Sequence, residues 1–288
     1  MRKLRITSPL GYQSQSKEDI SAYIKSGLLA HKELGFDGVD FSTQLLELVP
    51  GKWEAAAEQA VLDSREIGMP FVVSHLPYVK GGFVNKTDEF MEDFGRKMIQ
   101  AIEVAKVLGV ETAVMHTGNC ALERRKVDLD KEFEAAKRHL TPFVEHAAKL
   151  GVNAVVENMP IGLGQLVMHR YGQDAEEIIA LADYFGIGVC WDIGHANITG
   201  YDPYASITAL GSRLKQVHVH DNCGTRDSHS IPLTGEVNWE RAMAGLAAVD
   251  FKGAFDLEVK PGGMPAPTRM AYGRLAVETA EYLLTLMK

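Results

Sequence analysis

The sequence has few cysteines and no long apolar run, and both absences narrow the class of protein that it encodes. Its 288 residues include three cysteines, Cys120, Cys190 and Cys223, and none of them forms a Cys-x-x-Cys pair. Such a small, odd set argues against a disulfide framework and favours a reducing, cytoplasmic compartment. No segment approaches the roughly 20 apolar residues of a membrane-spanning helix, and the start MRKLRITSPLGYQ lacks the apolar core of a signal peptide. We therefore expect a cytoplasmic protein with no membrane partner.

An excess of basic residues is also missing. The chain carries 30 Lys and Arg against 38 Asp and Glu, which gives a formal net charge of -8. Nucleic-acid binding relies on clustered Lys and Arg, so this balance argues against nucleic acid as a partner, although a local basic groove is still compatible with it. Ser/Pro-rich linkers and low-complexity segments are absent as well. We expect residues 1–288 to form a single domain.

Short apolar runs alternate with longer helical patterns along the chain. Eight runs are candidate strands: residues 4–7, 38–41, 70–75, 111–116, 153–158, 188–193, 214–220 and 253–259. The segments between them carry apolar residues at three- and four-residue spacing, which is typical of amphipathic helices. The candidate helices are residues 17–35, 53–68, 88–109, 131–151, 175–186, 203–213, 238–250 and 269–288, and the first four end at a glycine suited to a left-handed cap.

Eight βα units of this length predict an α/β protein, a single (β/α)8 TIM barrel. The competing architecture is a doubly wound open sheet. That fold usually has fewer strands, and it binds its ligand with a glycine-rich loop after the first strand, which this sequence lacks.

Six successive candidate strands end in His, Asp or Glu. In chain order these residues, with those that follow closely, are His75, His116, Glu157, Asp192, His195, His218, His220, Asp227, His229 and Glu258. Functional side chains of a TIM barrel lie at the carboxyl ends of its strands. His, Asp and Glu are the usual ligands of Zn, Mn, Co and Mg. The pattern therefore indicates a metal site.

Each residue alone also has a structural interpretation. His75 could be a core histidine bonded to a carbonyl, Asp192 could cap the helix after the sixth strand, and Glu157 or Glu258 could pair with a neighbouring cation. Six buried polar strand ends at one rim would each be costly without a partner, so a shared cation accounts for them better. Three histidines within helical patterns are interpreted as structural: His31, His139 and His146.

Five stretches together resemble the xylose isomerase-like TIM barrel superfamily: VENMPIGLGQL, CWDIGHANITGYD, VHVHDN, RDSH and DLEVKPG. The superfamily includes sugar and sugar phosphate isomerases and epimerases, and the endonuclease IV family of AP endonucleases. The isomerase and epimerase branch holds one divalent ion with four residues. By position these would be Glu157, Asp192, His218 and Glu258. We prefer His218 to His220 because the family ligand lies three residues before an acidic residue, here Asp221; His220 is the alternative, or a substrate contact.

The resemblance to this branch implies a metal-dependent sugar or sugar phosphate isomerase or epimerase. One divalent metal (Mn, Co, Mg or Zn) would hold the oxygens of an α-hydroxycarbonyl substrate, and Glu157 and Glu258 would move the proton through an enediolate as the acid/base pair. His195 and Arg226 would bind substrate oxygens or a phosphate, although Arg226 could equally be a solvated loop cation. The implied partner is a small-molecule sugar or sugar phosphate.

The AP endonuclease branch is the alternative, with two or three Zn held by nine residues. Its additional ligands match His75, His116, His195, Asp227 and His229, and Tyr78 follows the first of these as in that family. Against it, the first strand lacks the Gly-x-His start of the endonucleases, and the segment after the second strand is short and acidic rather than basic. A non-catalytic sugar-binding barrel is a third interpretation. The oligomeric state is open, and a homo-oligomer is compatible with the sequence.

Overall fold

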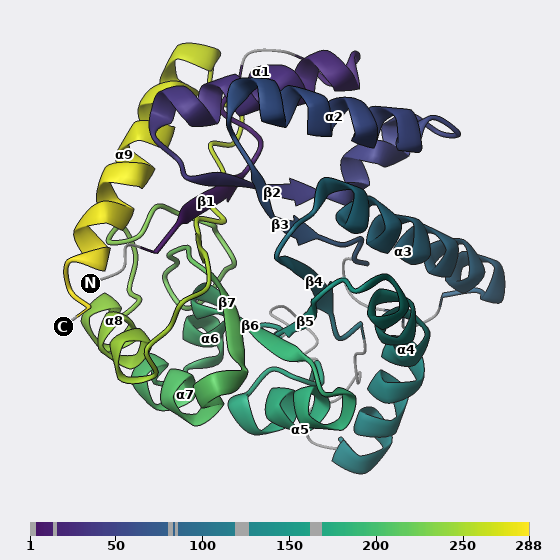
Figure 1. The fold of residues 1–288 in the computed structure, drawn as a ribbon. Helices are drawn as coiled ribbons and strands as arrows, with labels where there is room; N and C mark the ends of the chain where they lie inside the picture. Colours follow the sequence, from purple (N-terminus) through teal and green to yellow (C-terminus); the bar gives the residue numbers. More distant parts are fainter. Residues whose placement is uncertain are drawn as a thin grey trace.

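Eight parallel strands close into a barrel, in sequence order from β1 to β8, with helices around it (Figure 1). The computed structural model describes residues 4–13, 16–79, 83, 86–118, 127–161 and 169–287. The strands are β1 (Ile6–Pro9), β2 (Gly38–Ser42), β3 (Phe71–His75), β4 (Thr112–His116), β5 (Ala154–Glu157), β6 (Gly188–Asp192), β7 (Leu214–His218) and β8 (Phe255–Asp256). The predicted (β/α)8 barrel is confirmed.

Most of the described helices begin at a polar cap or end at a glycine. They are α1 (Ile20–Leu34), α2 (Trp53–Ile67), α3 (Asp88–Leu108), α4 (Leu129–Leu150), α5 (Ala175–Phe185), α6 (Ile193–Thr199), α7 (Pro203–Leu210), α8 (Trp239–Ala248) and α9 (Ala266–Leu284), with 3-10 turns η1 (Thr43–Leu48) and η3 (Gly211–Arg213). The four predicted glycine caps adopt left-handed backbone conformations: Gly35, Gly68, Gly109 and Gly151. None of the described helices is long and apolar enough to cross a lipid bilayer.

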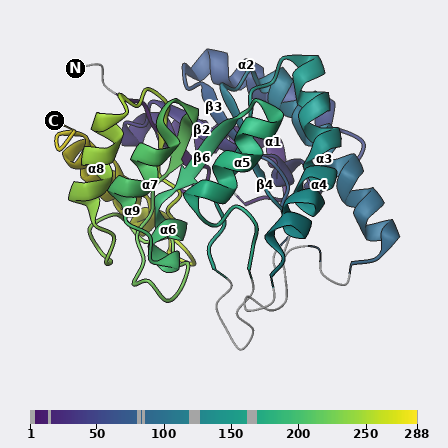
Figure 2. The ribbon, with the colours of Figure 1, turned by 90° about the horizontal axis from the view of Figure 1, so that it is seen from below.

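Three element boundaries differ from the sequence prediction. The sequence pattern predicted a strand over residues 188–193, but β6 ends at Asp192. The short helix α6 follows it directly and lies at one end of the barrel (Figure 2). The sequence pattern predicted β7 to reach residue 220, but it ends at His218. The last strand, β8, is two residues long because the N–H of Glu258 donates to the carbonyl of Asp256 instead of to a neighbouring strand. Glu258 and His220 therefore lie just beyond their strands.

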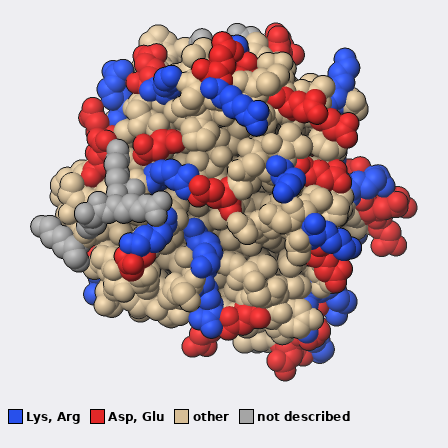
Figure 3. Space-filling model, viewed as in Figure 1, with Lys and Arg blue, Asp and Glu red and all other residues tan. Residues whose placement is uncertain are grey.

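Apolar side chains fill the space between the barrel and the helices. Trp191 and Phe255 are fully buried there, as the alternation of side chains along their strands predicts. Cys190 is buried and Cys223 is exposed, and both are free thiols, whereas Cys120 lies outside the described residues. On the face shown in Figure 3, acidic and basic side chains are intermixed, so the residues drawn in colour form no basic stripe across it.

Candidate metal centre

The carboxyl ends of the strands bring the predicted acidic and histidine side chains together. Strand register places His116 beside Glu157, and Asp192 beside His218. These strand ends form the floor of a pocket of about 500 Å³. Of the predicted residues, eight line this pocket: His75, His116, Glu157, His195, Arg226, Asp227, His229 and Glu258. The other three, Asp192, His218 and His220, are fully buried.

Glu157 lies at the centre of the cluster, with histidines around both carboxylate oxygens. Oε2 lies 3.1 Å from Nε2 of His116 and 3.4 Å from Nε2 of His75. Oε1 lies 3.2 Å from Nδ1 of His218 and 3.4 Å from Nδ1 of His195. Burial would raise the pKa of Glu157, but the charges of His218 and His116 outweigh it and hold the pKa well below its usual value. Glu157 is therefore a carboxylate, ready to bind a cation.

The four residues Glu157, Asp192, His218 and Glu258 form one group that could hold a metal ion. One ligand atom from each lies within 4.8 Å of the others. Besides its contact with Glu157, Nδ1 of His218 lies 3.5 Å from Oε2 of Glu258 and 3.9 Å from Oδ2 of Asp192. Two buried carboxylates and the partly buried Glu258 around one imidazole need a compensating positive charge. This oxygen-rich set fits Mn²⁺, Mg²⁺, Co²⁺ or Zn²⁺.

A second group joins His75 and His116 to the other side of Glu157. The Nδ1–H of His75 donates to the carbonyl of Leu76 at 2.9 Å, which turns Nε2 toward the site. Oε2 of Glu157 is buried and accepts no hydrogen bond, although both Nε2 atoms are close to it. The Nε2 atoms of His75 and His116 also lie 3.2 Å apart, so three polar atoms converge where a cation would find suitable ligands.

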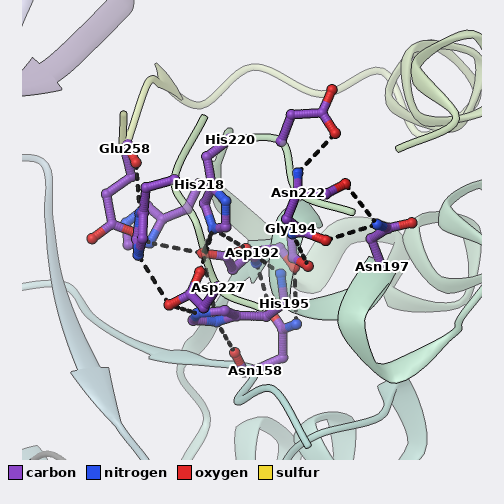
Figure 4. Close-up of polar contacts among 12 residues, drawn as sticks. Asn158, Asp192, Gly194, His195, Asn197, His218, His220, Asn222, Asp227 and Glu258 are labelled. Atoms are coloured by element: carbon purple, nitrogen blue, oxygen red, sulfur yellow. Dashed lines mark hydrogen bonds and ion pairs between the residues drawn. The ribbon is translucent and has the colours of Figure 1, made fainter. Parts of the chain in front are cut away.

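Asp227 connects two further histidines. Nε2 of His195 lies 3.7 Å from Oδ2 of Asp227 (Figure 4). Nε2 of His229 lies 3.0 Å from the same oxygen. Each ring is oriented by a backbone carbonyl: Nδ1 of His195 donates to Asn158 at 2.9 Å, and Nδ1 of His229 donates to Glu258 at 2.7 Å. The fixed rings present Nε2 toward the Asp227 carboxylate. Beside Asp227 lie two further groups that could hold a cation: Asp192 with His195 and His220, and Glu258 with His220 and His229.

His218 and His220 occupy different parts of the cluster. His218 belongs to the four-residue group, whereas Nε2 of His220 lies 3.1 and 3.2 Å from the two carboxylate oxygens of Asp192. His220 also stacks on His229, with ring centroids 4.2 Å apart. A Cβ at Gly194 would lie 2.1 Å from Cε1 of His220, so only glycine leaves room for this ring. The assignment of His218 to the metal, with His220 as the alternative, stays a prediction.

Asp192 serves as a helix cap and also belongs to the cluster. Its Oδ1 accepts a hydrogen bond from the N–H of His195 at 2.7 Å, which caps α6, while Oδ2 faces His218. Asn158 holds the backbone of Asp192 with two hydrogen bonds, to its carbonyl at 3.0 Å and from its N–H. The structural and the metal-site interpretations of Asp192 are therefore compatible.

Three buried polar residues near the site were missed by the sequence prediction: Asn158, Asp40 and Asp256. Oδ2 of Asp256 lies 3.8 Å from Nε2 of His218, on the side of the ring away from the group of four. Burial raises the pKa of Asp40 to about 6 and that of Asp256 well above its usual value. The sequence signal that could have identified Asp40 and Asp256 is a carboxylate within an otherwise apolar run, GVDF for the first and GAFDLEV for the second.

The structural histidines outside the cluster are as predicted. His31 is fully buried and its ring nitrogens contact the carbonyls of Gly27 and Ser8 at 2.9 and 3.1 Å. His139 packs against Phe83, and His146 lies 3.5 Å from Glu103. Tyr78, by contrast, lines the pocket and stacks on His116.

Comparison with known proteins supplies the family. A family model for the xylose isomerase-like TIM barrel matches residues 28–281. The uncharacterized protein MJ1311 of Methanocaldococcus jannaschii is 32% identical over 166 residues, which cover 56% of this chain and 54% of that protein. The uncharacterized protein y4fM of Sinorhizobium fredii is 24% identical over 158 residues, covering 54% of this chain and 50% of that protein. The chain thus spans about half the length of these relatives.

Solved structures with the same fold include several sugar epimerases. An L-ribulose 3-epimerase has a TM-score of 0.78 at 16% identity, covering 99% of this chain and 96% of that one. A D-allulose 3-epimerase from Methylomonas sp. has a TM-score of 0.75 at 17% identity, covering 99% of both chains. The 3-keto-D-glucoside 4-epimerase of E. coli has a TM-score of 0.73 at 16% identity, covering 98% of this chain and 100% of that one. At identities this low, the structural similarity establishes that the fold is shared.

Proposed function

Because the chain belongs to the family of xylose isomerase-like TIM barrels, we propose that it is a divalent-metal-dependent isomerase or epimerase of a small sugar or sugar phosphate. The observation that carries the proposal is the group Glu157, Asp192, His218 and Glu258, whose ligand atoms lie within 4.8 Å of one another. Two of its members, Glu157 and Glu258, also line the pocket. The epimerases among the structures of the same fold support it at the level of reaction class.

The proposed reaction moves a proton at the carbon beside a carbonyl group. One of the two glutamates accepts this proton; the electron pair of the C–H bond forms a C=C bond, and the π pair of the carbonyl moves to its oxygen, which gives an enediolate. Return of a proton to the same carbon from the opposite face completes epimerisation. Its return to the neighbouring carbon, with transfer of the hydroxyl proton to the other oxygen, completes isomerisation. A divalent cation on the four ligands would supply the positive charge that stabilises the two substrate oxygens.

Glu157 and Glu258 are suited to act as the proton acceptors. Burial would raise the pKa of Glu258, but the charges of His229 and His218 outweigh it, so the pKa of this carboxyl is lowered, like that of Glu157. Both are therefore ionised at neutral pH. Glu157 ends β5 and Glu258 follows β8; these strands are not neighbours in the barrel, so the two carboxylates would approach a substrate in the pocket from two sides. His195, which lines the same pocket, is placed to contact substrate oxygens.

The histidine groups beyond the group of four favour a second candidate function, an AP endonuclease-like phosphodiester hydrolase with two or three zinc ions. Its supporting observation is the pair His75 and His116, whose Nε2 atoms lie 3.4 and 3.1 Å from Oε2 of Glu157. Zinc in these groups would supply Lewis-acid chemistry for phosphate-ester hydrolysis. The net charge of -8 makes this the weaker candidate.

Solvent exchange tests the proposed function whichever product the reaction forms. The protein is incubated in D₂O with a panel of ketoses and ketose phosphates, and deuterium at the carbon beside the carbonyl is measured by NMR. We expect metal-dependent incorporation that Glu258→Gln abolishes. No incorporation with any sugar, combined with cleavage of abasic-site DNA, would replace this proposal with the second candidate.

A further inference from the structure

We propose that the pocket selects a substrate that carries a phosphate monoester, and that Arg170, Arg226 and Lys260 receive this group. The inference deepens the proposed sugar isomerase or epimerase function and rests on it. The three cations come from three separate connections, after β5, β7 and β8, and all of them line the one pocket that contains Glu157 and Glu258. Only Arg226 was singled out by the sequence.

None of the three cations forms an ion pair with a described carboxylate. Guanidinium groups elsewhere on this molecule do find such partners: Arg213 contacts both carboxylate oxygens of Asp183, and Arg241 contacts both oxygens of Asp202. Bidentate geometry of this kind is equally suited to a phosphate. Within the described part of the chain, the cations of the pocket thus have no carboxylate partner, which suits them to bind an anionic ligand.

Arg170 carries the most specific sign of a missing partner. The side chain is half-buried, and its Nε is buried without a hydrogen-bond acceptor among the described residues. A buried charged donor without an acceptor is costly, because it has lost its water and gained nothing in return. An anionic substituent at this wall of the pocket would supply the acceptor.

The carboxylates of the pocket do not neutralise these cations, because they face histidines instead. Asp227 contacts His229 at 3.0 Å, and Glu258 lies 3.5 Å from His218. Glu157 is surrounded by its four histidines. Among the carboxylates and the Lys and Arg side chains alone, three negative and three positive charges line the pocket and balance. A divalent cation among the carboxylates would leave the pocket positive, which favours a dianionic substrate.

The size of the pocket agrees with a phosphorylated small sugar. Its volume of about 500 Å³ lies within the range of roughly 300–1,000 Å³ that is common for small-molecule sites. Two of the four proposed metal ligands, Glu157 and Glu258, line it together with the three cations. The structures of the same fold are named for uncharged sugars, so this pocket would differ from them in substrate charge.

Calorimetric titration of the metal-loaded protein with two matched ligand pairs tests the proposal: D-ribulose 5-phosphate against D-ribulose, and D-fructose 6-phosphate against D-fructose. We expect at least one phosphorylated ketose to bind about tenfold or more tightly than its uncharged partner. Arg226→Gln, Lys260→Gln and Arg170→Gln should each remove most of that difference. Arg226→Lys should retain part of it, because it keeps the charge. Inorganic phosphate should compete with the phosphorylated ligand only.

The control variant is Arg65→Gln, which removes an exposed cation in the last turn of α2, outside the pocket lining. It should bind both ligands as the wild type does. Equal binding of the charged and uncharged ketoses, or equal loss of both in the pocket variants, would overturn the phosphate site. Deuterium exchange separates this result from failure of the proposed function: exchange into uncharged ketoses alone would keep the function and overturn the site. Phosphate-selective binding without exchange into any sugar would keep the site and overturn the function.

Discussion

Nδ1 of His218 lies 3.2 Å from Oε1 of Glu157, although the two residues come from β7 and β5 and are separated by 61 positions in the sequence. The carboxyl end of β6 lies between these strands and contributes Asp192 to the same group. Burial would lower the pKa of His218, but neighbouring acidic groups, including Glu157, outweigh burial and raise the pKa well above its ordinary value. In the metal-free protein this imidazole therefore holds a proton where a cation would bind.

Cation binding should release protons and strengthen as the pH rises. A metal ligand must be a neutral imidazole, so the proton on His218 has to leave when the cation enters. Calorimetric titration of Mn²⁺ or Zn²⁺ in two buffers with different ionisation enthalpies measures the protons released. We expect net release at about pH 7 and tighter binding at about pH 8. Binding that neither releases protons nor depends on pH would contradict this arrangement.

The metal-free protein should lose stability as the pH rises above neutrality. Burial lowers the pKa of His75 and His195, but the carboxylates Glu157 and Asp192 outweigh it and raise these values to about 9 and about 10. A raised folded-state pKa contributes stability that is complete below the unfolded value of about 6.5 and is lost as the pH passes through the folded value. Urea unfolding with chelator at several pH values should show this decline, and a flat profile from about pH 6 to 10 would contradict it.

Gly194→Ala should destabilise the protein and disturb the cluster. The added Cβ would lie 2.1 Å from Cε1 and 2.4 Å from Nδ1 of His220, a buried ring that contacts Asp192. We expect a loss of about 1–3 kcal/mol in the free energy of unfolding. The matched control is Gly95→Ala in α3, where a Cβ meets nothing within 4 Å, and which should be neutral or up to about 1 kcal/mol more stable. Equal effects of the two substitutions in urea unfolding would show that His220 is not fixed at this place.

Glu258→Gln should remove most of the activity while the protein stays folded. The substitution keeps the shape of the side chain but removes a proton acceptor and one negative charge from the four-residue group. We expect the rate of deuterium incorporation to fall by about 10²- to 10⁴-fold. Glu236→Gln, an exposed residue outside the pocket lining, is the control and should exchange at the wild-type rate. Activity above half of the wild-type rate in Glu258→Gln would exclude this residue as the base.

The periodic parts of the fold were predictable, and the irregular ends of the strands were not. Eight apolar runs located the eight strands, because a parallel barrel buries both faces of each strand. The early end of β8 depends on a bond between Glu258 and Asp256 that no periodicity reveals. The helix α6 depends on Asp192 as its cap, which the sequence presented only as one of two interpretations.

The residues of the site that end strands could be predicted, whereas those that lie in the connections between strands and helices could not. His75, Glu157 and their counterparts stand at fixed places in the βα repeat, so the shared rim follows from topology. Arg170 and Lys260 reach the pocket from connections whose course depends on tertiary packing. Asp256 was not predicted because it lies within a strand that is otherwise apolar, and not at the end of one.

The metal content of the protein, purified without chelator or affinity tag and measured by elemental analysis, tests the central claim most directly. Our account predicts about one divalent Mn, Co, Mg or Zn per chain, lost in Asp192→Asn. Two or three Zn per chain would show that the groups around His75 and Asp227 are also occupied, and would favour the second candidate function. A protein that contains no metal and takes none up on titration would contradict the claim that these strand ends form a metal site.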